Sequence, residues 1–412
     1  MYEMEQIDER VILVGIDTGN EDAANRSLDE LSELAKTAKA AVVGRLIQPR
    51  ESAHPGTYIG KGKLTELKDL IWETDATGII CDDELTSAQL GNLEEELSCK
   101  IIDRTLLILD IFAARAVSGE GKIQVELAQL RYRASRLAGL GRSLSRLGGG
   151  IGTRGPGEKK LEMDRRLIRE RISRLKKELK DVEKHRELIR TQRKQSGLKV
   201  AALVGYTSAG KSSIENVLTN AGILEDAMLF STLDTTTRSL VLDNTQEILV
   251  TDTVGFIRKL PHHLVEAFKS TLEEAKYADI IIHVVDASNP QMDEQMHVVY
   301  DTLRQLGAAD RPVITLFNKQ DARTDNEPLH GFRADYTLNI SAAKDLGLDE
   351  VKSLLEEILR ENKVYIERII PYDKAGVIQL IRKQGELVSE EYVADGIQIK
   401  AYVPMEVYGR LD

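Results

Sequence analysis

The stretch Lys199–Ser212 reads KVAALVGYTSAGKS and decides the fold of the region around it. Its apolar run Val200–Val204 has the length of a buried strand. The residues from Gly205 to Ser212 follow the pattern GxxxxGK[ST], and a helical pattern comes next. Backbone N–H groups of such a loop surround a phosphate, and the dipole of the following helix favours negative charge. The stretch therefore predicts a phosphate-binding loop in a doubly wound α/β domain.

Two side chains of this loop have expected roles in nucleotide chemistry. We expect Lys211 to neutralise the β- and γ-phosphates, and Ser212 to offer its hydroxyl to Mg²⁺. Mg²⁺ prefers oxygen ligands and keeps several waters, so we predict it as the cofactor. The predicted nucleotide contacts in the loop are Gly205, Tyr206, Thr207, Ser208, Ala209, Gly210, Lys211, Ser212 and Ser213.

Three more motifs follow in order, each after a strand-like run. They are Asp252-Thr253-Val254-Gly255, Asn318-Lys319-Gln320-Asp321 and Ser341-Ala342-Ala343. The carboxyl ends of parallel strands share one edge of a sheet, so the motifs predict one site. We expect Asp252 to hold a Mg²⁺-bound water, Gly255 to meet the γ-phosphate, and the Ser341 loop to contact guanine O6. Asp321 can accept from N1–H and the 2-amino group of guanine, donors that adenine lacks, so we predict binding of GTP and GDP. An unpaired buried acceptor costs ~1–3 kcal/mol.

The segment Phe230–Arg238, FSTLDTTTR, lies between the first two motifs and is the expected switch. A threonine here should coordinate Mg²⁺ when the γ-phosphate is present, but spacing alone does not choose one. The candidates are Thr232, Thr235, Thr236 and Thr237. Predicted nucleotide contacts in the segment are Phe230, Ser231, Thr232, Leu233 and Asp234.

Phe256 follows Gly255, at the position where Ras-like GTPases carry a glutamine that orients the attacking water. A phenyl ring cannot do this, so we predict slow hydrolysis by the protein alone, with a partner supplying the missing group or ordering. Arg238 and Arg258 could supply charge from the same chain, although an ordinary surface role is the simpler interpretation for each.

The rest of the chain predicts a multidomain α/β protein with four parts. Residues 1–118 alternate strand and helix signals, which indicates an N-terminal α/β domain. Residues 119–197 contain two heptad-like helices, Lys122–Leu137 and Glu158–Lys194, which predict an antiparallel coiled-coil hairpin. The joining stretch Gly139–Gly157 is rich in glycine, and we expect no helix to persist through it. Residues 198–362 form the predicted GTPase domain, and residues 363–412 a small α+β domain.

Composition narrows the class of protein. The apolar fraction of 42% suits folded domains, and no apolar run is long enough to span a membrane. The N-terminus has no secretory signal pattern, and two cysteines exclude a disulfide framework. Charge is uneven: residues 131–199 hold 22 Lys and Arg against 8 Asp and Glu, a net charge of +14, whereas the whole chain carries −11.

These motifs resemble the HflX family of translational GTPases. The resemblance rests on GYTSAGKSS, FSTLDTTTR, DTVGFIRKLP and NKQD, and on LGGGIGTRGPGEKKLEMDRR at Leu147–Arg166 and YIGKGKLTEL at Tyr58–Leu67. It implies a cytoplasmic, partly ribosome-associated GTPase that binds the large ribosomal subunit and the 70S ribosome and splits stalled or idle ribosomes. It also assigns the Mg²⁺-coordinating role to Thr232, which joins Lys211 and Gly255 as expected catalytic residues.

The basic segment agrees with a ribosomal RNA partner, because Lys and Arg gain affinity by releasing counterions from RNA. The candidate RNA contacts are Arg142, Arg146, Arg154, Lys159 and Lys160. The family's reported ATP binding finds little support here, since Gly60-Lys-Gly62-Lys63 lacks the trailing Ser or Thr of a phosphate loop. The chain also departs from the family pattern: Thr235 stands for proline, Ser213 for threonine, and Ile214-Glu215 for Leu-Phe.

Other functions fit parts of this pattern. A GTPase that assembles the large subunit would bind immature particles and leave 70S ribosomes intact. A non-ribosomal regulatory GTPase would act through a protein partner and make the basic hairpin incidental. An ATP-driven helicase is disfavoured by Asp321. We expect a monomer and no DNA partner.

Overall fold

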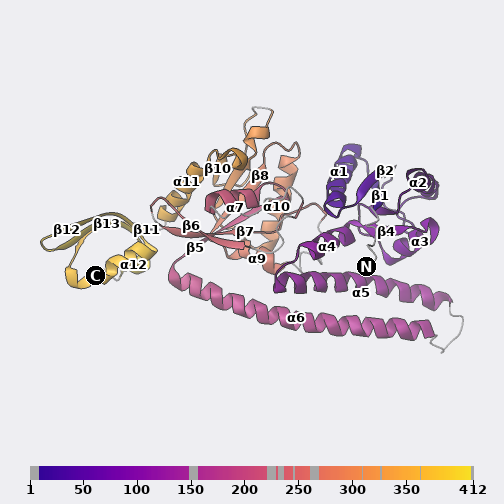
Figure 1. Ribbon diagram of the computed structural model, residues 1–412, viewed down its shortest axis with the longest axis horizontal. Helices are drawn as coiled ribbons and strands as arrows, with labels where there is room; N and C mark the ends of the chain where they lie inside the picture. Colours follow the sequence, from indigo (N-terminus) through magenta and orange to yellow (C-terminus); the bar gives the residue numbers. More distant parts are fainter. Residues whose placement is uncertain are drawn as a thin grey trace, which may run out of the picture. The chain divides into compact units, whose positions relative to one another are not determined.

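The computed structural model describes residues 9–147, 156–219, 229–230, 236–244, 246–259, 269–308, 310–324, 327–361 and 363–409 (Figure 1). Contacts divide the chain into two compact units. The first unit comprises Met1–Val182, Met228–Leu233 and Lys259–Phe268, and the second comprises Glu183–Ala227, Asp234–Arg258 and Lys269–Asp412. The multidomain α/β class predicted from the sequence is confirmed.

The first unit contains a four-stranded parallel sheet in the order β2-β1-β3-β4. Its elements are β1 (Arg10–Asp17), α1 (Glu21–Thr37), β2 (Ala41–Pro49), α2 (Lys61–Thr74), β3 (Gly78–Cys81), α3 (Ser87–Leu97) and β4 (Lys100–Asp103). Polar side chains start the helices, because they accept from N–H groups that lack a helical partner. Asn20 accepts from Ala23 N–H, and Thr86 forms a capping box with Gln89. The predicted alternation of strands and helices is confirmed.

Three helices follow the sheet: α4 (Arg104–Arg115), α5 (Gly119–Leu147) and α6 (Pro156–Ser196). The helix α4 was not predicted from the sequence. Asp103, at the end of β4, fastens α5 to the sheet. It accepts from Tyr132 Oη at 3.0 Å, pairs with Arg136, and caps α4 through Leu106 N–H. One buried carboxylate thus orients two helices.

The helices α5 and α6 form the predicted antiparallel pair. Arg171 of α6 grips Glu126 of α5 with two hydrogen bonds of 2.7 and 2.8 Å, and Leu175 is buried in the seam. The expected loop over Gly139–Gly157 was wrong at its edges, because α5 stays helical to Leu147 and α6 begins at Pro156. Each helical glycine costs only about 1 kcal/mol, and leucine and arginine between them favour helix.

The second unit contains a six-stranded sheet in the order β10-β9-β8-β5-β7-β6. Its strands are β5 (Lys199–Gly205), β6 (Thr236–Val241), β7 (Glu247–Asp252), β8 (Ile280–Asp286), β9 (Val313–Asn318) and β10 (Tyr336–Asn339). Five strands are parallel, and only the edge strand β6 runs antiparallel to its neighbour. Part of the expected switch, from Thr236 to Arg238, is therefore strand. Its polar, alternating sequence suits an edge and hides the strand from hydrophobicity alone.

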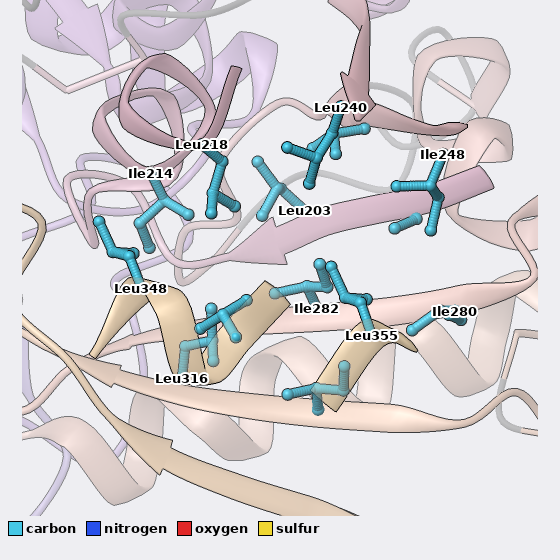
Figure 2. Packing of buried hydrophobic residues seen from close by; sticks show 14 of the residues in the cluster. Leu203, Ile214, Leu218, Leu240, Ile248, Ile280, Ile282, Leu316, Leu348 and Leu355 are labelled. Atoms are coloured by element: carbon cyan, nitrogen blue, oxygen red, sulfur yellow. The ribbon is translucent and has the colours of Figure 1, made fainter. Parts of the chain in front are cut away.

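The described helices beside this sheet include α7 (Lys211–Thr219), α9 (Lys269–Tyr277), α10 (Met292–Leu306) and α11 (Leu348–Glu361). Figure 2 shows Ile214 and Leu218 of α7 and Leu348 and Leu355 of α11 lying over the sheet residues Leu203, Ile282 and Leu316. These side chains are 4% exposed or less, so the core fixes α7 against the strand ends. The last turns of α6 belong to the same unit, where Arg190 pairs with Glu274 at 2.7 Å.

The chain ends in a small α+β part, as predicted. It comprises β11 (Lys363–Ile370), α12 (Gly376–Gln384), β12 (Glu386–Val393), β13 (Gly396–Pro404) and α13 (Met405–Tyr408). The antiparallel sheet has the order β11-β13-β12 and a core of its own around Ile381, Ile399 and Val403. The strand β12 was not predicted, because its run of glutamates obscures the apolar alternation. Among the described residues, no helix is long and apolar enough to cross a membrane.

His283 of β8 is buried at the centre of the second sheet and gives the protein a testable acid sensitivity. Its ring meets Tyr300 edge-on, with 5.0 Å between centroids. Burial, helped by the charge of Lys211, lowers the pKa of His283 to about 3. The unfolded chain takes up this proton below about pH 6.5 and the folded chain does not, so acid favours unfolding.

We expect the free energy of unfolding to fall by about 1.4 kcal/mol for each pH unit between 6.5 and 3, relative to His283→Asn, which cannot titrate there. Urea unfolding without nucleotide, measured at several pH values for both proteins, checks this. Parallel pH profiles would contradict it.

Candidate nucleotide-binding site

The phosphate-loop motif occupies the turn between β5 and α7, as predicted. Gly210 has φ +96°, and a Cβ there would lie 2.3 Å from Asn318 Nδ2. A Cβ on Gly205 would lie 2.3 Å from the carbonyl oxygen of Val284. Both glycines are therefore required by close approach, and Gly210 also by its backbone conformation. The loop is held against β8 and β9 with no room for side chains at these two points.

Lys211 starts α7 and turns back over its own loop. Its Nζ donates to the carbonyl oxygens of Tyr206 and Gly205 at 3.0 and 3.2 Å. Burial lowers the pKa of Lys211 to about 8, and the charge of Asp252 opposes this shift. A desolvated ammonium gains strongly from an anion beside it, which a bound phosphate would supply.

Two oxygen donors for a metal ion meet beside this lysine. Ser212 Oγ donates to Asp252 Oδ2 at 2.8 Å, although the two residues are 40 positions apart. Asp252 ends β7 and is fully buried. A hydroxyl and a carboxylate are ligands that Mg²⁺ accepts, and phosphate oxygens and water would supply the remainder of its shell. The donor set therefore fits Mg²⁺, which would neutralise phosphate charge when bound.

The Asp252–Gly255 loop lies directly against the phosphate loop. Thr207 N–H donates to Phe256 O at 2.8 Å, and Phe256 N–H donates to Gly205 O at 3.0 Å. A Cβ on Gly255 would lie 2.9 Å from Thr207 Cα and 3.1 Å from Lys211 Nζ. Glycine at this position lets the two loops touch. The Phe256 side chain is 2% exposed, so its ring packs in the protein interior.

Both arginines considered as sources of positive charge are engaged by carboxylates. Arg258 pairs with Glu294, and its backbone N–H donates to Tyr206 Oη at 2.8 Å. Arg238 Nε lies 4.0 Å from Glu215 Oε2. These pairs agree with the simpler interpretation, in which neither arginine serves the nucleotide.

The base-recognition motifs meet through one side chain. Asn318, at the end of β9, is 2% exposed. Its Nδ2 donates to Ala209 O at 2.9 Å, and its Oδ1 accepts from Ala342 N–H at 3.0 Å. One amide thus joins the phosphate loop, the Asn318–Asp321 motif and the Ser341–Ala343 motif. Both hydrogen bonds are buried, where leaving either backbone partner unpaired is costly.

Asp321 is exposed beside this amide and is fixed by its neighbour. Ser341 Oγ donates to Asp321 Oδ1 at 2.5 Å, and this bond is the main reason that the pKa of Asp321 is lowered. Lys319 adopts a left-handed backbone, φ +63°, and pairs with Asp286 at 2.7 Å. An ionised, oriented carboxylate at the rim of the sheet is the acceptor that guanine requires.

Models of known protein families match most of this chain. The model for the GTP-binding GTPase N-terminal region matches residues 25–113, that for the GTP-binding GTPase middle region matches 115–193, and that for a 50S ribosome-binding GTPase matches 200–319. A GTPase HflX of Lacrimispora saccharolytica is 64% identical over 411 residues, covering 100% of this chain and 97% of that protein. The chain belongs to the HflX family of GTPases. The resemblance inferred from the motifs is therefore confirmed.

More distant HflX proteins match most of the chain as well. The GTPase HflX of Caldanaerobacter subterraneus is 50% identical, with 100% of this chain and 95% of that protein covered. The one from Escherichia coli is 42% identical over 80% of this chain and 77% of that protein. A solved complex of SsGBP with GDP covers 85% of this chain and 98% of that chain, at 24% identity and a TM-score of 0.49.

The structure describes most of the residues expected to form a nucleotide site in this HflX chain. The described part of the site comprises Gly205 to Ser213, Asp252 to Gly255, Asn318 to Asp321 and Ser341 to Ala343. Ser231, Thr232, Leu233 and Asp234 lie outside the described residues. Phe230 is described, and its ring meets Phe112 edge-on within the first unit, 4.7 Å between centroids.

Four of the five candidate RNA contacts belong to the helical pair. Arg142 and Arg146 belong to α5, and Lys159 and Lys160 belong to α6, but their side chains are not described. Arg154 lies outside the described residues. Their contact with RNA stays a prediction.

Sequence reasoning overlooked one charged residue of the site. Glu215 of α7 has no exposed surface, and burial raises its pKa to about 7. The sequence does signal it, because a glutamate stands where the HflX pattern has phenylalanine. The motifs give this departure no role, whereas the structure gives the carboxylate specific polar partners in Thr236 and Arg238.

The bridging amide of Asn318 provides a test of the site. Asn318→Ala leaves the Ala209 carbonyl and the Ala342 N–H unpaired, each worth about 1–3 kcal/mol when buried. We expect a less stable protein with at least about tenfold weaker GDP binding, measured by chemical denaturation and fluorescence titration. Asn339→Ala, which alters an exposed asparagine of the adjacent strand, is the matched control. Unchanged GDP affinity in Asn318→Ala would show that the bridge does not organise the site.

Proposed function

We propose that this protein binds and hydrolyses GTP with Mg²⁺ and uses the nucleotide cycle to split ribosomes into subunits. The observation that carries the nucleotide assignment is the Asn318 bridge, with Asp321 oriented by Ser341 beside it. Its two hydrogen bonds hold the phosphate loop at a fixed spacing from the base-binding carboxylate. Membership of the HflX family supports hydrolysis as the activity.

In this proposal each motif has one role. Lys211 and the backbone N–H of Gly255 stabilise charge on the γ-phosphate, and Ser212, Thr232 and Asp252 hold Mg²⁺, Asp252 through water. Asp321 selects guanine. The buried Phe256 and the paired Arg238 and Arg258 provide no group to orient water, which supports slow hydrolysis without a partner.

Ribosome binding is supported by two independent features. The matching family model for residues 200–319 describes a 50S ribosome-binding GTPase. The segment 131–199 carries a net charge of +14 on a long helical pair, which suits a polyanionic RNA partner. We propose the large subunit and the 70S ribosome as partners, a cytoplasmic and partly ribosome-associated location, and a monomeric protein. The four-part division at residues 118, 197 and 362 is part of the same proposal. The family description equally suits a large-subunit assembly factor, so the experiment must separate assembly from splitting.

We expect purified 70S ribosomes to raise GTP turnover by at least about tenfold, with light scattering falling as subunits separate. If light scattering also falls with a non-hydrolysable GTP analogue, GTP binding is sufficient for splitting, and hydrolysis serves release of the protein from the ribosome. Stimulated turnover with constant scattering would favour assembly over splitting.

Replacing Arg142, Arg146, Arg154, Lys159 and Lys160 by alanine should weaken ribosome binding and reduce its salt dependence. Replacing the exposed α2 residues Lys61 and Lys68 is the control.

Asp321→Asn tests the base assignment separately. An asparagine can accept from N1–H and donate to the 2-carbonyl oxygen of xanthine, but it cannot accept from both N1–H and the 2-amino group of guanine. We expect GDP affinity to fall on the order of 100-fold or more and XDP affinity to rise, measured by competition binding. Equal GDP binding by both proteins would refute this contact.

A further inference from the structure

Glu215 is a fully buried carboxylate on the helix that follows the phosphate loop. It lies three residues after Ser212 on α7, and its Oε2 accepts from Thr236 Oγ1 at 2.8 Å. The same oxygen lies 4.0 Å from Arg238 Nε. Thr236 is the first residue of β6, so one carboxylate joins α7 to the start of the edge strand.

The strand register connects this carboxylate to the metal donors. Thr236 is the direct cross-strand partner of Asp252 in the antiparallel β6–β7 pair. The neighbouring side chains Thr237 and Thr251 continue the contact through their hydroxyls, 3.0 Å apart. Asp252 in turn accepts from Ser212. These contacts form a closed series. Helix α7 carries both Ser212 and Glu215, Glu215 accepts from Thr236, Thr236 pairs with Asp252 across the strands, and Asp252 accepts from Ser212.

A charged group at this position needs a reason, because burying a carboxylate is costly unless polar partners compensate. Burial is the main cause that raises the pKa of Glu215, while the Thr236 hydroxyl, Arg238 and the backbone N–H of Asp252 oppose it. The elements that Glu215 joins, α7 and β6, contribute Ile214, Leu218 and Leu240 to the apolar core, and a buried apolar side chain carries no such cost. Compared with an apolar residue, Glu215 adds a hydrogen bond between α7 and β6.

We propose that Glu215 is a positioning residue for the Ser212–Asp252 oxygen pair and so for Mg²⁺ binding with nucleotide. Its hydrogen bond to Thr236 holds β6, and through the cross-strand pair β7, at a fixed distance from α7. Groups that orient metal ligands in this way commonly contribute ten- to a hundredfold in metal affinity. The inference rests on the proposed nucleotide site and adds a residue that the motifs do not contain.

The test measures the MgCl₂ concentration that half-saturates binding of fluorescent GDP, together with hydrogen exchange of β6 amides in the nucleotide-free protein. Glu215→Leu and Thr236→Val should each raise the half-saturating Mg²⁺ concentration by about tenfold or more and speed exchange in β6. Since they break the same bond, the double variant should be no worse than the poorer single variant. Glu215→Gln keeps an acceptor oxygen and should stay within about threefold of the wild-type value.

Ser239→Ala is the matched control. It also removes a side-chain hydrogen bond of β6, but that bond is the exposed 2.5 Å contact with Glu247 of β7 and does not involve α7. It should leave the Mg²⁺ requirement unchanged. If Glu215→Leu does not fold, Thr236→Val, which keeps the side-chain shape, carries the test alone. The inference would be overturned if Thr236→Val had the Mg²⁺ dependence and the β6 exchange rate of the wild-type protein. It would also be overturned if Glu215→Gln were as impaired as Glu215→Leu. A wild-type protein that binds no guanine nucleotide would instead refute the proposed function.

Discussion

The nucleotide site depends on the pair of hydrogen bonds made by the side chain of Asn318. The amide sits at the end of β9, reaches the phosphate loop through Ala209 and reaches the Ser341 loop through Ala342. Because the amide is buried, both backbone groups have no ready replacement for it, and the three loops keep one spacing. A phosphate site and a base site become a single nucleotide site only at that spacing.

Close backbone approach is the second constraint. The phosphate loop and the Asp252–Gly255 loop share a short backbone ladder through Thr207 and Phe256. Gly255 and Gly210 stand where a Cβ would collide with neighbouring atoms. The Phe256 ring is buried at this junction and carries no polar group that could orient a water. Phe256 therefore has two consequences. Its backbone stabilises the contact between the loops, and its apolar side chain is the reason that we expect hydrolysis to need a partner.

Three of the buried charged residues lie where phosphate and metal would bind. Lys211, Asp252 and Glu215 are all buried, and desolvation shifts the pKa of Lys211 downward and that of Glu215 upward, each toward the neutral form. An anionic nucleotide would oppose the shift of Lys211, because the buried ammonium would gain a partner. The apolar core beneath, between α7, α11 and the sheet, provides the rigid support that such a site requires.

The sequence by itself determined the nucleotide motifs, their order at strand ends, the preference for guanine and the family, because each is written in a short local pattern. The antiparallel helical pair was predicted from its heptad-like spacing for the same reason. Only the tertiary structure decided that Asn318 bridges to Ala209, 109 residues away, that Glu215 meets Thr236, and that β6 and β12 are strands. These features arise from packing between distant segments: a buried carboxylate or a polar edge strand becomes favourable only once its partner is in place.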